Sequence, residues 1–409
     1  GEPCREVRGA DHTKAGLADV TCENLTAVIA AIAGKDDTGT QTDALGELQT
    51  LIDGISTAAA ALGAFAEANT QGIATPTGTA PDLAAYTAAG VTGVTAGNLA
   101  AINDALASAP VTGDKANSSA ELQAIVDAYS AILAEANDLA NSAGDTTPDA
   151  TPNADPSIDP TAAQYATIGA NIGAAATDIE NLSLLNDIVG AKQTANVDTI
   201  AEINELARIA NAIQTVAAGG TPNPALTAVD LTKAGLADVT DDNLAAVIAA
   251  IANKDDAGTQ TDSLGELQTL VNGITGSFDQ IVQAAQDNTA VRTALNDSVF
   301  TAAGVTGVST ANLPLIREML DTDSITGTSV ASTPQIQALV DAVQQIESLT
   351  DDSNNSATDL SAADITALGL GSAIDSAAER SLFSDILDNS TAAEANQAAE
   401  ILNLASIAD

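Results

Sequence analysis

The sequence predicts an all-α protein, a tandem array of small two- or three-helix modules arranged in two copies of about 200 residues each. Four observations lead to this prediction. A long segment recurs almost unchanged, and apolar residues return at helical spacing behind capping residues. The apolar content comes from Ala, Leu, Ile and Val, because aromatic residues make up only 2% of the chain. Alternation typical of strands is rare.

The internal repeat fixes the expected domain organisation. Residues 13–55 recur as residues 232–274, with 8 of the 43 positions changed and 35 identical. We therefore expect a leader at 1–12, copy one at 13–216, a Gly/Pro-rich linker at 217–228 and copy two at 229–409. Each copy divides into three modules with approximate bounds 13–75, 76–143 and 161–216 in copy one, and 229–290, 291–350 and 360–409 in copy two.

The first two modules of each copy share the pattern Thr-x-Ala-Gly-apolar, followed by Ser/Thr-x-x-Asn-Leu. The glycine is placed to end a helix in the left-handed conformation, at Gly16, Gly90, Gly235 and Gly304. The following hydroxyl residue is expected to be the N-cap of a short helix, at Thr21, Thr95, Thr240 and Ser309.

A longer helix is expected after each short one. Residues 118–140 predict such a helix, since Ser118 and Glu121 form a capping box and apolar residues follow at 3.6-residue spacing. The same box, at Thr199-x-x-Glu202 and Thr391-x-x-Glu394, predicts two more helix starts. Pro314 is expected near the fifth position of its helix, where it would remove a hydrogen bond.

Charge and composition exclude several function classes. The chain carries 55 Asp and Glu against 12 Lys and Arg, a formal net charge of −43. Nucleic acid and anionic membrane surfaces are poor partners for such a chain. No uninterrupted apolar run approaches the ~18 residues of a membrane span. His12 is the only histidine and phosphate-binding glycine motifs are missing, so we expect no enzyme and no cofactor other than a cation.

The two cysteines, Cys4 and Cys22, lie at the N-terminal end, and Asp241 replaces Cys22 in copy two. They are either two unrelated buried thiols or one disulfide that ties the leader to the first module. We favour the disulfide, which indicates an oxidising compartment. The chain begins with Gly1 and has one methionine, Met319, so we expect a removed export signal and an extracellular or cell-surface location.

Two acidic loops invite a calcium interpretation. The segments 35–43 and 254–262 are near-identical, and their carboxylates are Asp36, Asp37, Asp43, Asp255, Asp256 and Asp262. Oxygen donors of this kind suit Ca²⁺, although neither loop has the Gly and Glu positions of an EF-hand. A solvated acidic loop and a weak calcium site both remain open.

Residues 82–133 resemble the albumin-binding GA-type module of three helices, where a helix also ends in Ala-Gly-apolar before a short helix. The chain is also similar to the Ala/Thr/Asp-rich helical repeats of large secreted bacterial surface proteins. The resemblance implies small helical bundles and an extracellular role. It transfers no binding residue to this chain.

Two hypotheses about function follow. The first is a non-enzymatic extracellular structural protein that assembles with itself into a bacterial surface filament, sheath or surface layer. The alternative is a monomeric stalk or adhesin segment that binds a host or matrix protein through its GA-like helical modules. The acidic surface predicts that assembly needs counterions or calcium.

Overall fold

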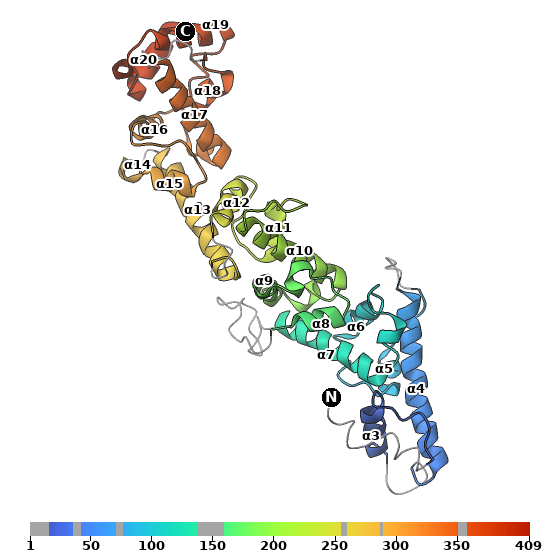
Figure 1. Cartoon of the computed structure of the whole chain (residues 1–409). Helices are drawn as coiled ribbons and strands as arrows, with labels where there is room; N and C mark the ends of the chain where they lie inside the picture. Colours follow the sequence, from blue (N-terminus) through green and yellow to red (C-terminus); the bar gives the residue numbers. More distant parts are fainter. Residues whose placement is uncertain are drawn as a thin grey trace. The chain divides into compact units, whose positions relative to one another are not determined.

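The computed structural model describes residues 16–35, 42–70, 77–136, 159–254, 260–286, 289–350 and 358–409. Over these residues it contains eighteen α-helices, five 3₁₀ helices and no β-strand (Figure 1). The predicted all-α class is confirmed for the described residues. The chain divides into two compact units, one of residues 1–214 with 262–264, the other of residues 215–261 with 265–409.

The first unit alternates short and long helices. Their bounds are α3 Leu25–Ala33, α4 Leu45–Ala68, α5 Leu83–Ala88, α6 Leu99–Leu106, α7 Ser119–Ala136, α8 Ala162–Thr167, α9 Ile179–Gly190 and α10 Ile200–Ala217, the last turn of α10 passing into the second unit. Three 3₁₀ helices lie between them, η1 Gly113–Lys115, η3 Gly173–Ala176 and η4 Thr194–Asn196. Helix α7 packs against α8 and α9, and α4 packs against α3, α5 and α7 (Figure 1).

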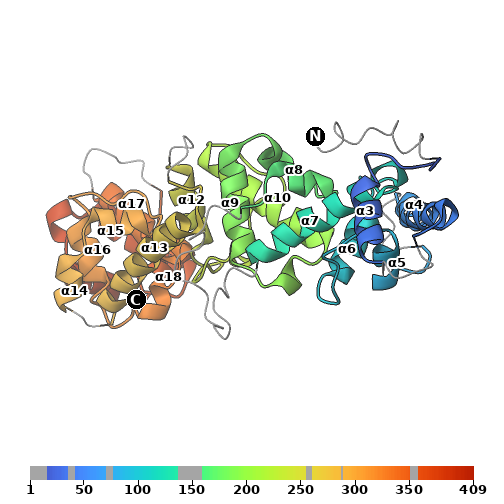
Figure 2. The same cartoon turned by 90° about the horizontal axis from the view of Figure 1, so that it is seen from below.

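The second unit has the same alternation. Its helices are α11 Ala228–Ala234, α12 Leu244–Ala252, α13 Leu264–Ala284, α14 Thr289–Ala294, α15 Asp297–Ala302, α16 Leu313–Met319, α17 Thr333–Leu349, α18 Ala362–Ala367, α19 Ala377–Asp388 and α20 Ala398–Ala408. The 3₁₀ helices are η5 Gly327–Val330 and η6 Ala392–Glu394. Helix α17 contacts α16, α18 and α19, and Figure 2 shows α15, α16 and α17 together.

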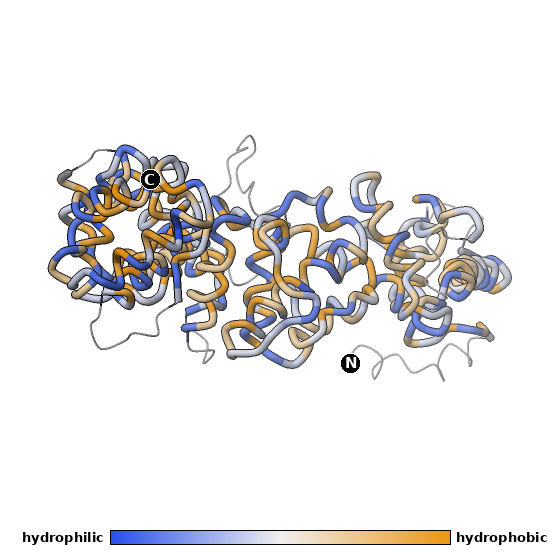
Figure 3. The backbone as a smooth tube through the Cα atoms, turned by 90° about the horizontal axis from the view of Figure 1, so that it is seen from above, coloured by the Kyte–Doolittle hydropathy of each residue, from blue (hydrophilic) through white to orange (hydrophobic). Residues whose placement is uncertain are grey.

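Each long helix buries one stripe of its surface. On α7 the predicted stripe of Leu122, Ile125, Val126, Tyr129 and Ile132 is buried throughout. Figure 3 shows the resulting pattern, in which hydrophobic and hydrophilic stretches alternate along the helices. Small side chains in the short helices, such as Ala27 of α3 and Ala246 of α12, let the neighbouring backbones at Gly90 and Gly304 approach closely.

Helix α4 is long and apolar enough to cross a membrane by length and composition alone. Its buried side chains instead form one stripe, Ile52, Ile55, Ala59, Leu62 and Ala66, which faces the neighbouring helices of the first unit. One buried stripe is the pattern of an amphipathic helix that packs on one side. The expectation that the chain has no membrane span therefore stays a prediction that this burial favours.

The Ala-Gly turns adopt the predicted backbone. All four glycines have positive φ, from +71° at Gly90 to +117° at Gly235. The predicted caps at Thr21, Thr95 and Thr240 are wrong. Each short helix begins after an Asn instead, and that Asn side chain accepts the N–H of the hydroxyl residue three positions earlier, at distances between 2.7 and 2.9 Å in all four turns. Ser309 accepts the N–H groups of Ala311 and Asn312, which lie before α16, so the predicted cap at Ser309 is wrong as well.

The capping boxes are reciprocal at Ser118 and at Thr199, as predicted. The box at Thr391 opens the 3₁₀ helix η6, and α20 begins only after Gln397, whose N–H donates to Glu400. The expectation for Pro314 is wrong. Helix α16 begins at Leu313, so the proline occupies the first turn, where its missing N–H costs no hydrogen bond.

Candidate functional site

The structure describes two of the six carboxylates predicted as calcium ligands. Asp43 and Asp262 each lie two residues before a long helix, α4 and α13. Asp36, Asp37, Asp255 and Asp256 lie outside the described residues. A hydrogen bond with Asp43 is the largest of the effects that raise the pKa of Glu47, so two carboxylates share one place at this helix start.

Within the described ranges, no group of three or more His, Cys, Asp or Glu side chains is placed to hold a metal ion. Calcium binding by the two loops therefore stays a prediction, because it depends on the neighbouring carboxylates. Cys22 precedes α3, and Cys4 lies outside the described residues, so the disulfide also stays a prediction. His12 is likewise outside them.

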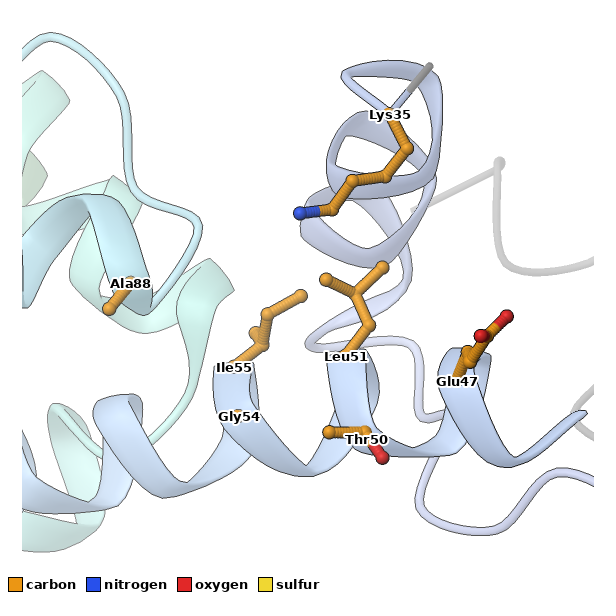
Figure 4. A pocket seen from close by; sticks show the side chains of 7 residues that line it. All are labelled: Lys35, Glu47, Thr50, Leu51, Gly54, Ile55 and Ala88. Atoms are coloured by element: carbon orange, nitrogen blue, oxygen red, sulfur yellow. The ribbon is translucent and has the colours of Figure 1, made fainter. Parts of the chain in front are cut away.

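A shallow hollow of about 450 Å³ lies along α4 (Figure 4). Leu51 and Ile55 form its floor, Lys35 from the end of α3 extends over them, and Glu47 lies at one end. Its lining is mostly aliphatic and carries one amine and one carboxylate. Such a surface suits apolar contact better than catalysis. Elsewhere, burial lowers the pKa of Lys192 to about 8.

A recurring contact joins short helices to the starts of long ones. The Asp104 carboxylate on α6 accepts a hydrogen bond from the Ile200 N–H, the first residue of α10, at 2.6 Å. The Glu318 carboxylate on α16 accepts from the Ala398 N–H, the first residue of α20, at 3.0 Å. Each bond satisfies a helix N–H that has no partner inside its own helix, and places a negative charge at the positive end of the helix.

Asp187 makes the same contact from α9. Its carboxylate accepts the Leu264 N–H at 3.0 Å, and both residues belong to the first unit. Asp104, Asp187 and Glu318 all stand six residues after an Asn near the start of the short helix. Asn98 and Asn312 directly precede α6 and α16, and Asn181 is the third residue of α9. The carboxylate is therefore part of a repeated short-helix pattern.

A backbone carbonyl replaces the carboxylate where the sixth residue is alanine. The Glu23 carbonyl before α3 accepts the Ala120 N–H at 2.9 Å, and the Asp242 carbonyl before α12 accepts the Thr333 N–H at 3.2 Å. The acceptor changes, but it always comes from the start or the side of a short helix. The donor always comes from the first turn of the second long helix that follows that short helix.

Close backbone packing accompanies these bonds. A Cβ atom added to Gly90 would lie 2.4 Å from the Cβ of Ala27 on α3, and one added to Gly304 would lie 2.8 Å from the Cβ of Ala246 on α12. These glycines therefore combine a left-handed turn with a contact that no larger residue allows. The alanine that each one touches is itself buried.

Burial raises the pKa of Asp104, and the nearby Asp198 adds to this, while the hydrogen bond from Ile200 lowers it. The balance is a raised pKa, so burial outweighs the helix N–H. Sequence patterns alone did not predict a role for these carboxylates. Their constant six-residue distance from Asn was the available signal, but it does not reveal the partner, which for Asp104 lies 96 residues away.

No protein-family description, curated protein or solved structure matches the chain. The contacts themselves therefore carry the functional argument. We call a run of short helices together with the long helix that follows it a helix set. The contacts form a packing site between helix sets, because they consist of helix-end hydrogen bonds and small-residue contacts and do not surround a cleft.

Proposed function

We propose that the chain is a non-enzymatic extracellular structural protein, a self-assembling subunit of a bacterial surface filament, sheath or surface layer. In this proposal each unit is an array of two- or three-helix modules, and the chain consists of two tandem copies of about 200 residues. Export fits the expected Cys4–Cys22 disulfide.

One observation carries the proposal, the recurring contact between the short helix of one set and the long helix of the next. It occurs from α3 to α7 and from α6 to α10 in the first unit, and from α12 to α17 and from α16 to α20 in the second. A contact that is used repeatedly within a chain is available for use between chains, because each set presents the same two faces.

Electrostatics sets the conditions for assembly. At −43 per subunit, copies repel one another unless ions screen the charge, and screening confines that repulsion to about 8–10 Å at physiological salt. Divalent ions at the acidic loops would add neutralisation. We therefore expect assembly in saline that contains calcium, and weaker assembly in low salt or with a chelator.

Electron microscopy of the purified chain tests this proposal, with and without a calcium chelator and at low and physiological salt. We expect regular filaments or sheets that shorten or disperse when calcium or salt is removed. Dispersed single particles under every condition would contradict self-assembly and favour a stalk or adhesin segment. A search for a host or matrix protein partner would then follow.

A further inference from the structure

One position on the short helices is buried in five helices and exposed in the sixth. It is the third residue after the Asn near the start of the helix, or after Glu379 in α19. The exposed fraction of the side chain is 5% at Ala27, 1% at Ala101, 0% at Leu184, 2% at Ala246 and 4% at Leu315, but 46% at Leu382 of α19. Ala27 and Ala246 are the residues that the glycines of the next helix set touch. Leu382 therefore marks a packing face without a neighbour in the described chain.

The carboxylate series ends on the same face. Asp385 occupies the position of Asp104, Asp187 and Glu318, six residues after Glu379. The other three carboxylates each receive the first N–H of a long helix. Asp385 is exposed, and no hydrogen bond reaches its carboxylate from the described part of the chain. The acceptor is present, and its donor is missing.

Ile407 lies on α20, the helix that packs against α19, and it is exposed at a position that is buried on other long helices. It stands nine residues after the first residue of its long helix. The matching residues Ala128 of α7 and Ala342 of α17 are 3% and 0% exposed, on helices that pack against α8 and α18 of the next set. Ile407 is 61% exposed. We call Leu382, Asp385 and Ile407 the tail face.

The complementary half is exposed at the start of α4. The first residues of the other long helices, Ser119, Ile200, Leu264, Thr333 and Ala398, are between 4% and 7% exposed. Leu45, the first residue of α4, is 53% exposed, and its N–H has no acceptor among the described residues. We call Leu45 and the first turn of α4 the head.

We propose that the tail face of one copy binds the head of a second copy. The Asp385 carboxylate accepts the Leu45 N–H, as Asp187 accepts the N–H of the homologous Leu264. The Leu45 side chain covers the exposed apolar surface beside Asp385. The positive end of the α4 dipole also meets a carboxylate, which is a favourable charge arrangement.

This inference rests on the proposed self-assembly and gives it a direction. The two faces differ, so the contact is head-to-tail and does not close on a dimer. Repetition of a head-to-tail contact builds an open filament unless the rotation between copies closes it into a ring. A tail-to-tail contact would instead stop at two copies, because it uses the same face on both.

The test uses three variants of the 409-residue chain, Leu45→Glu, Leu382→Glu and the control Ile179→Glu. Ile179 is 74% exposed and lies on neither face. Sedimentation velocity in calcium-containing saline measures assembly, and circular dichroism checks that each variant keeps its thermal midpoint. We expect the two interface variants to associate about 10- to 100-fold more weakly than the wild type, as expected for one lost leucine contact. The control variant should assemble as the wild type does.

Mixing the two interface variants gives the sharpest result. The Leu45→Glu copy keeps its tail face and the Leu382→Glu copy keeps its head, so each variant alone should show only the weakened association while the mixture forms dimers at wild-type strength. Assembly of Leu45→Glu alone at wild-type strength would overturn the head-to-tail inference. Wild-type assembly that both variants preserve would also overturn it and leave the proposed function standing. A wild-type chain that never assembles would refute the proposed function itself.

Discussion

At the scale of single residues, buried polar groups in the first unit come in matched pairs. The hydroxyl of Tyr86 donates to Asn103 Oδ1 at 2.6 Å, and the hydroxyl of Tyr165 donates to Asn186 Oδ1 at 2.9 Å. Both tyrosines are fully buried. Each Asn also donates to the carbonyl of a proline that precedes the first short helix. Each Tyr–Asn pair therefore links the proline before the first short helix, the first short helix and the second short helix in one hydrogen-bond network.

The second unit changes both members of the pair together. Phe300 takes the place of tyrosine, and Arg317 takes the place of asparagine and donates directly to the Leu295 carbonyl. In the last helix set Ser384 accepts the Leu360 N–H at 3.0 Å. Where the tyrosine hydroxyl is lost, the Asn side chain that accepted its hydrogen bond is lost as well. No buried acceptor is therefore left without a donor.

Replacement of Tyr165 by Phe should lower the free energy of unfolding by about 1–2 kcal/mol, since Asn186 Oδ1 would stay buried without its donor. Urea unfolding followed by circular dichroism measures the effect. The same replacement in an Asn186→Ala background is the control, because there the acceptor is already gone and the cost should be smaller. Equal costs in both backgrounds would show that the hydrogen bond contributes nothing.

All three tyrosines of the chain should resist ionisation. Burial raises the pKa of Tyr86, Tyr129 and Tyr165 above the ordinary value of about 10. The folded state therefore keeps protons that the unfolded state releases, so this stabilisation is complete below pH ~10 and is lost as pH rises further. Ultraviolet absorbance should show no tyrosinate until the chain unfolds in alkali, and then all of it together. Gradual ionisation near pH 10 in the folded chain would contradict the described burial.

At the scale of secondary-structure elements, the contact from α6 to α10 can be separated into hydrogen bond and charge. Asp104→Ala leaves the Ile200 N–H without its acceptor and should cost about 1 kcal/mol of stability, as for a lost helix cap. Asp104→Asn keeps an acceptor and removes a charge that burial disfavours, so its stability at neutral pH should equal or exceed that of the wild type. Urea midpoints compare the variants, with Asp385→Ala as a control that should change nothing in the monomer.

The pH dependence of the same variants gives a second readout. The raised pKa of Asp104 means that the folded state holds its proton more tightly than the unfolded state does. Its contribution to stability is therefore full below pH ~3.9 and is lost as pH rises through the folded pKa. The wild type should lose this contribution over that window and Asp104→Asn should not. Identical pH profiles of stability would show that the charged Asp104 carboxylate does not destabilise the folded state.

Local rules explain why the helices were predictable from the sequence. A glycine after an apolar helix predicts positive φ, and Gly90 and Gly304 have it because L side chains avoid that conformation. The caps at Thr21 and Thr95 were mispredicted because the Asn three residues later folds back onto the hydroxyl residue's own N–H. The packing site was not predictable in the same way. Its partners are far apart in sequence, and only tertiary packing brings the Asp104 carboxylate to α10.

At the scale of the whole molecule, the excess of 43 negative charges opposes both folding and assembly. Ion pairs among the described residues, such as Arg208 with Glu205 and Arg292 with Asp321, offset little of it, because the chain has only 12 basic residues. Apolar burial and helix-end hydrogen bonds must therefore stabilise each unit against repulsion, and dissolved ions must reduce that repulsion.

The thermal midpoint should accordingly rise with salt. Between about 0.01 and 0.15 M the screening length falls from about 30 to 8 Å. If this relieves ~1 kcal/mol in a unit of this size, the midpoint moves by about 2–4 °C. Sodium chloride and choline chloride should act equally, since screening depends on ionic strength alone. No response to either salt would contradict the importance of repulsion.

A comparison of calcium with magnesium distinguishes charge screening from specific ion binding by the acidic loops. At constant ionic strength, millimolar calcium should raise the midpoint more than magnesium does if the loops at 36–43 and 255–262 hold the ion. The double variant Asp43→Asn/Asp262→Asn should lose that excess and keep the response to sodium chloride. Equal effects of calcium and magnesium, unchanged in the variant, would show that the loops are solvated acidic segments. Assembly would then depend on ionic strength alone, and a chelator would leave filaments intact in saline.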